Sequence, residues 1–195
     1  MTVNNIKYLT KNKEKSIVRT KETQENKRQK TVQTADNEEG IFMANRIILN
    51  ETSYYGAGAI REIVPEVRGR GAKKVLVVTD NALMKAQVAT KVTQVLDEGG
   101  VAYEVYDKIK PNPTIENVQE GVAACKAAGA DIIVAIGGGS AIDTSKAIAI
   151  IMKNPEFSDV RSLEGASPTK HKALPIIAVS TTSGTAAEVT INYVI

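Results

Sequence analysis

The residues best suited to chemistry lie in one stretch, residues 131–146, where three consecutive glycines precede a serine. Gly137, Gly138 and Gly139 lack a Cβ atom, so a ligand could approach their backbone closely. Five apolar residues come before the glycines and a helical pattern follows them, which predicts a strand-to-helix turn. Unpaired N–H groups at such a helix start bind anions, above all phosphate. The stretch therefore predicts a phosphate-binding turn, with a purely structural turn as the alternative.

Side chains beside the glycines strengthen this interpretation. Ser140 is a suitable N-cap for a helix over residues 140–152. Asp143 follows three residues later, where a carboxylate favours the positive end of a helix. The turn matches neither Gly-x-Gly-x-x-Gly nor Gly-x4-Gly-Lys-[Ser/Thr]. It therefore resembles a dinucleotide site in its strand, glycine turn and helix, but not in its sequence motif.

The surrounding elements alternate between strand and helix. Continuous apolar runs without alternation are typical of strands that are buried on both faces of a parallel sheet. This order predicts an α/β fold, with a mainly parallel sheet flanked by helices and a Rossmann-like, dinucleotide-binding arrangement. The predicted strands are residues 46–51, 74–79, 101–106, 132–136 and 175–180. The predicted helices cover residues 58–69, 84–98 and 140–152, and Thr114 caps a further helix whose apolar face runs from Ile115 to Cys125. A long polar loop is predicted over 153–172, and a helix start at 186–189.

Three polar clusters follow predicted strands: Thr79-Asp80, residues 137–140 and residues 181–185. Ligands of open parallel sheets bind at the carboxyl ends of the strands, so these clusters predict a nucleotide site. Asp80 could accept hydrogen bonds from a ribose diol and would repel an added 2′-phosphate, which favours NAD over NADP. The alternative for Asp80 is a solvated carboxylate at the end of a strand.

Composition excludes several other classes of function. The chain has one cysteine, Cys125, on the apolar face of a predicted helix, so no internal disulfide can form and a cytoplasmic location is expected. Its one histidine, His171, lies in a polar stretch and is interpreted as a surface residue, so no self-contained metal site is predicted. No apolar run is long enough to span a membrane.

The net charge of +3 belongs to the first 42 residues, which hold nine Lys/Arg and six Asp/Glu. This segment is predicted to be a disordered, solvated tail, and nucleic-acid binding is not expected because acidic residues are interleaved. A second hypothesis is that Met43 is the true start, because Glu38-Glu39-Gly40 corresponds to purine-rich codons typical of a ribosome-binding site. Residues 43–195 are then the NAD-binding α/β domain.

Several motifs in order resemble the iron-containing alcohol dehydrogenase family. They are the glycine stretch through Lys146, the Pro111-Asn112-Pro113 loop and the Thr181-to-Thr190 run. The resemblance covers Met43 to Ile195 and implies a two-domain, usually dimeric enzyme that transfers hydride between NAD and a small alcohol or aldehyde. By position, it implies the following cofactor-binding residues: Asp80 and Asn112 at the adenosine end, Gly138, Gly139 and Ser140 at the pyrophosphate, Asp143 and Lys146 in the same motif, and Thr181, Thr182, Ser183, Gly184 and Thr185 at the nicotinamide half.

The sequence departs from this family in its metal ligands. Members bind a divalent metal, usually iron, through one aspartate and three histidines on a helical second domain, and none of these ligands can be assigned here. The expectation is a cofactor-binding half, truncated after Ile195, that is inactive alone. Two alternatives stay open: a fragment of a related NAD- and metal-dependent enzyme of dehydroquinate-synthase type, and a non-enzymatic nucleotide-binding module.

Overall fold

The computed structural model describes residues 3–4, 50–165 and 167–195. Residues 46–49 of the predicted strand 46–51 and almost all of the predicted tail lie outside the described residues, and Asn50 and Glu51 are not part of a strand. Within the tail, Val3–Asn4 form the short strand β1. This strand and the other described residues belong to one compact unit.

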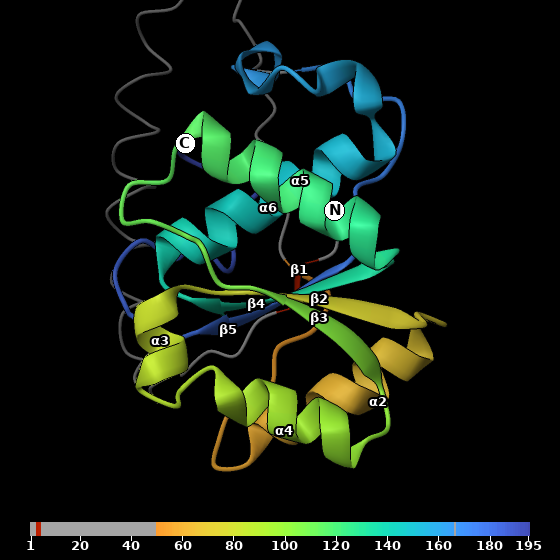
Figure 1. The fold of residues 1–195 in the computed structure, drawn as a ribbon, viewed down its shortest axis with the longest axis vertical. Coiled ribbons are helices and arrows are strands. Elements are labelled where there is room, and N and C mark those ends of the chain that lie inside the picture. Colours follow the sequence, from red (N-terminus) through yellow and green to blue (C-terminus); the bar gives the residue numbers. More distant parts are fainter. Residues whose placement is uncertain (1–2, 5–49, 166) are drawn as a thin grey trace, which may run out of the picture. The chain divides into compact units, whose positions relative to one another are not determined.

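A parallel sheet with the strand order β1-β5-β4-β2-β3 forms the centre of this unit (Figure 1). Every strand pair is parallel, which confirms the predicted architecture. The register pairs Val78 with Ala135 and Gly137 with Ser180, so the carboxyl ends of β2, β4 and β5 meet at one edge of the sheet. The strands are β2 (Lys74–Val78), β3 (Ala102–Tyr106), β4 (Ile132–Gly137) and β5 (Ile176–Ser180).

Helices cover both faces of the sheet, with α5 and α6 on one face and α2 and α4 on the other (Figure 1). The helices are α2 (Ile63–Gly69), α3 (Asn81–Lys85), α4 (Thr90–Glu98), α5 (Ile115–Ala128) and α6 (Gly139–Lys153). Within the described residues, short 3-10 helices are η1 (Ala59–Glu62), η2 (Pro155–Phe157) and η3 (Val160–Leu163). None of the helices in the described part of the chain is long and apolar enough to cross a membrane.

The apolar runs of β2 and β4 divide between two cores. Leu76 and Ile133 belong to the cluster beneath α5 and α6, whereas Val75 and Ile132 belong to the cluster beneath α2 and α4. All six residues of β4 are buried, as the absence of alternation in its sequence predicts. Cys125 lies in the first cluster, and its burial raises the pKa of the thiol to about 11, which agrees with a packing role.

Three local predictions are wrong, and backbone geometry explains each. The helix predicted from Met84 onward is split into α3 and α4, because Gln87 between them has a φ of 56°, which a right-handed helix cannot accommodate. Ala186 has a φ of 51°, and a turn replaces the helix predicted at 186–189. Helix α6 begins one residue early, at Gly139, so its N-cap is Gly138 and not Ser140.

Candidate functional site

The glycine turn lies where β4 ends and α6 begins. Gly137 has a φ of 153°, and a Cβ atom built on it would lie 2.8 Å from the Cβ of Ala141, so both backbone geometry and space require glycine there. Gly138 is the N-cap of the 15-residue helix α6, and no side chain caps the helix through this residue. The first N–H groups of a helix have no partner within the helix. They can therefore donate to an anion.

Two threonine hydroxyls border this turn. A Cβ atom at Gly138 would lie 3.0 Å from Thr182 Oγ1, and one at Gly139 would lie 3.2 Å from Thr185 Oγ1. The Thr181 N–H donates to the Gly137 carbonyl at 3.0 Å and holds the segment after β5 beside the turn. The structure thus brings together the glycines and the hydroxyl-rich run at residues 181–185. These five residues are exposed, so their hydroxyls are accessible to a ligand.

Asp80 follows β2 at the same edge of the sheet. Its Oδ1 accepts a hydrogen bond from the Leu83 N–H at 2.8 Å, so Asp80 is the N-cap of α3. The cap uses one of the two carboxylate oxygens, and the residue is partly exposed. Sequence reasoning missed this structural role, although an aspartate directly before a helix is a familiar N-cap signal. A cap and a ribose ligand are compatible roles for one carboxylate.

Asn112 lies in the loop after β3, between two prolines, with a φ of 53° and an exposed side chain. Asparagine tolerates this left-handed backbone better than most residues. No hydrogen bond joins Asn112 to the glycine turn within the described residues. Asn117, which the sequence analysis did not single out, fixes the start of this loop by donating to the Lys108 carbonyl at 3.0 Å.

Asp143 and Lys146 form a buried ion pair on α6. Lys146 is fully buried, and its Nζ donates to Asp143 Oδ1 at 3.0 Å, to Thr190 Oγ1 at 3.1 Å and to the Asn192 carbonyl at 2.6 Å. Burial lowers the pKa of Lys146, whereas the Asp143 carboxylate opposes that shift. All three N–H donors of the ammonium are thus used within the protein. Sequence spacing could not reveal these partners, because Thr190 and Asn192 lie 44 and 46 residues away.

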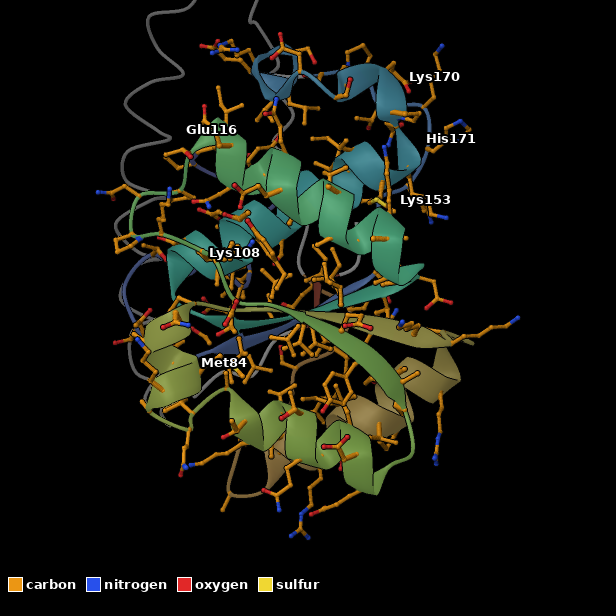
Figure 2. All side chains as sticks on the ribbon, in the orientation of Figure 1. Met84, Lys108, Glu116, Lys153, Lys170 and His171 are labelled. Carbon is orange, nitrogen blue, oxygen red and sulfur yellow. The ribbon has the colours of Figure 1, made fainter. Side chains whose placement is uncertain are left out.

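His171 lies away from the glycine turn. Figure 2 shows His171, Lys170 and Lys153 on one side and Met84 of α3, the helix that follows β2, on the other. His171 is exposed, and its backbone is held by the buried side chain of Asn154, which bonds both its N–H and its carbonyl. Among the described residues, no group of three or more His, Cys, Asp or Glu could hold a metal ion.

A cavity of about 1020 Å³ does not coincide with the glycine turn. It lies between the start of α5, the η3 segment and the last five residues, and its lining includes Val160, Leu163 and Tyr193. The turn offers N–H donors at a helix start whereas much of the cavity wall is apolar, so the turn is the better candidate for binding an anion.

Known proteins share this arrangement. The sequence profile described as "iron-containing alcohol dehydrogenase" matches residues 50–195. The lactaldehyde reductase of Escherichia coli K12 is 56% identical over 153 residues, which cover 78% of this chain and 40% of the relative. Alcohol dehydrogenase 4 of Saccharomyces cerevisiae is 39% identical over 138 residues, covering 71% of this chain and 36% of that protein.

Solved structures agree with these sequence relatives. An alcohol dehydrogenase from Oenococcus oeni superposes with a TM-score of 0.70 at 36% identity, covering 75% of this chain and 38% of that one. A 1,3-propanediol oxidoreductase superposes with a TM-score of 0.66 at 33% identity, covering 76% of this chain and 38% of that one. The chain therefore spans about 40% of the length of the relatives that it matches. With the profile matching three quarters of its residues and this sheet at its centre, the chain belongs to the iron-containing alcohol dehydrogenase family.

Proposed function

We propose that this chain binds NAD at the carboxyl edge of its sheet, as the cofactor-binding part of an oxidoreductase that acts on small alcohols and aldehydes. The observation that carries the proposal is the geometry at Gly138 and Gly139. Any side chain there would enter the space between the helix start and the hydroxyls of Thr182 and Thr185. A pyrophosphate fits this space chemically, because it needs a close backbone approach, N–H donors and hydroxyl donors.

The remaining predicted contacts follow the order of the strands. The pyrophosphate would be held by Gly138, Gly139 and Ser140, and the adenosine half would extend toward Asp80 after β2 and Asn112 after β3. The nicotinamide half would extend toward residues 181–185 after β5. Bound NAD would supply the hydride acceptor, and this chain's residues would bind and orient it.

For the substrate, we propose lactaldehyde and its reduction product, 1,2-propanediol. The support is the 56% identity to the Escherichia coli lactaldehyde reductase over most of this chain. The family name implies iron, but the described residues offer no matching set of ligands, so no chemical step is assigned to a metal held by them. We propose a cytoplasmic, dimeric enzyme on the resemblance alone. The buried, unpaired thiol of Cys125 agrees with a reducing compartment.

The Asp80→Asn variant tests the choice of cofactor. Asparagine retains an oxygen that can cap α3, so helix stability should change little. The loss of the negative charge removes a charged hydrogen bond to the ribose and the repulsion of a 2′-phosphate. We expect the preference for NAD over NADP to fall by roughly tenfold, the scale of one charge-assisted hydrogen bond. Isothermal titration calorimetry with NAD and with NADP measures the two affinities and so this preference.

The matched control is Asp159→Asn. Asp159 is also an N-cap, because it accepts a hydrogen bond from the Arg161 N–H at the start of η3, but it lies outside the strand-end clusters. The control should leave both affinities unchanged. Equal affinities for NAD and NADP in the unmodified chain, or an unchanged preference in Asp80→Asn, would refute the role of Asp80.

A further inference from the structure

The ion pair of Asp143 and Lys146 ties the last residues of the chain to α6. Lys146 donates to the Thr190 hydroxyl and to the Asn192 carbonyl, while Asp143 Oδ2 accepts from the Val194 N–H at 3.2 Å. Three residues of one exposed segment are thus held by two side chains one helical turn apart. The Lys146 side chain is fully buried and that of Asp143 is 14% exposed.

From Thr190 the hydrogen bonds continue to Thr185, which lies beside the glycine turn. The Thr190 hydroxyl lies 3.3 Å from the Ala187 carbonyl, and the Ala187 N–H lies 3.4 Å from Thr185 Oγ1. Thr185 Oγ1 in turn lies 3.2 Å from the position of a Cβ atom on Gly139. A continuous series of contacts therefore joins the buried ammonium to the hydroxyl beside the phosphate-binding backbone.

The energetic basis of this series of hydrogen bonds is the burial of Lys146. A buried lysine is costly unless it is paired and fully hydrogen-bonded, so the acceptors at residues 190 and 192 are held strongly in place. Thr185 lies in an exposed segment, next to Ala186 with its left-handed backbone, and has few other restraints among the described contacts. Fixing this hydroxyl before the ligand arrives lowers the entropy cost of binding.

We infer that Asp143 and Lys146 are positioning residues, which hold the Thr185 hydroxyl over Gly139 through Thr190 and Ala187. The two residues then contribute to NAD binding without touching the cofactor. This inference rests on the proposed NAD site. It assigns a role to two motif residues whose side chains are already engaged within the protein.

A double-mutant cycle tests the inference, with Lys146→Met, Thr185→Val and the double variant titrated with NAD. If Lys146 acts through Thr185, each single variant loses affinity by about tenfold, as expected for one hydrogen bond, and the double variant loses no more than Thr185→Val alone. A merely structural role of Lys146 gives additive losses. Unchanged NAD affinity in a folded Lys146→Met variant also overturns the inference.

Thr190→Val provides a second route should Lys146→Met not fold. Thr190 is exposed, and the substitution breaks the series while Lys146 keeps Asp143 and the Asn192 carbonyl as acceptors. The double variant of Thr190→Val and Thr185→Val should likewise lose no more NAD affinity than Thr185→Val alone. Lys74→Met is the matched control: it removes a partly exposed ion pair with Glu104 on β2 and β3, and it should leave NAD affinity unchanged.

Hydrogen exchange without ligand separates this inference from the proposed function. In Lys146→Met or Thr190→Val, backbone amides of residues 187–194 should exchange faster than in the unmodified chain, while those of α5 stay protected. Failure of the unmodified chain to bind NAD would defeat the proposed function and, with it, the contribution of the two residues to NAD binding. Unchanged exchange at residues 187–194 in both variants would defeat the inference.

Discussion

Replacement of Gly139 by valine is expected to lower the affinity for NAD by at least about 100-fold, since overpacking a close contact costs 1–3 kcal/mol and the displaced pyrophosphate adds to that cost. A Cβ atom at this position would already lie 3.2 Å from Thr185 Oγ1, and the two methyl groups of valine would extend further into the proposed phosphate space. Titration of the purified variant with NAD measures the loss. Circular dichroism must show a retained fold.

The matched control is the same substitution at Gly69, the last residue of α2. A Cβ atom at Gly69 has no neighbour within 4 Å, so Gly69→Val should fold and bind NAD like the unmodified chain. Unchanged NAD binding by a folded Gly139→Val variant would contradict the phosphate-binding role of the turn. Equal losses in both variants would indicate a general effect of valine on the fold.

The second large effect concerns turnover: the purified 195-residue chain is expected to bind NAD yet not to oxidise 1,2-propanediol. Removal of the hydroxyl proton is favoured when a bound divalent cation lowers the pKa of the alcohol, an effect of several kcal/mol. Such a cation needs about three protein ligands. The only histidine, His171, is exposed, and the described residues contain no group of three or more His, Cys, Asp or Glu that could hold a metal ion.

The assay follows NADH formation from 1,2-propanediol with excess ferrous iron. The Escherichia coli lactaldehyde reductase, assayed in parallel, is the positive control, and Gly139→Val of this chain gives the background. No NADH above that background is expected. Sustained, iron-dependent turnover by the unmodified chain would show that its own residues form a complete active site.

Sequence patterns predict the sheet and the edge at which the proposed site lies. The apolar runs that became β2, β4 and β5 are long, continuous and bounded by polar residues, so strand identity and parallel pairing follow from burial on both faces. The same pattern places Asp80, the glycines and residues 181–185 at one edge. Secondary structure and strand order thus suffice to bring the cofactor-binding candidates together.

Backbone conformation at single residues is harder to predict. Gln87 and Ala186 adopt left-handed φ values, which their residue types disfavour, so the split of α3 from α4 and the turn after Ala186 depend on tertiary packing. The partners of Lys146 are unpredictable for a similar reason. Thr190 and Asn192 reach α6 through a turn and not through a regular element, so no periodicity in the sequence indicates their positions.

Hydrogen exchange of the unmodified chain with and without NAD tests the proposed cofactor site most directly. NAD should slow the exchange of backbone amides at residues 138–140, where the helix start donates to phosphate, and at residues 181–185, while equimolar NADP should protect them less. Protection confined to the residues that line the 1020 Å³ cavity, or no protection at the glycine turn at saturating NAD, would contradict a cofactor site at the carboxyl edge of the sheet.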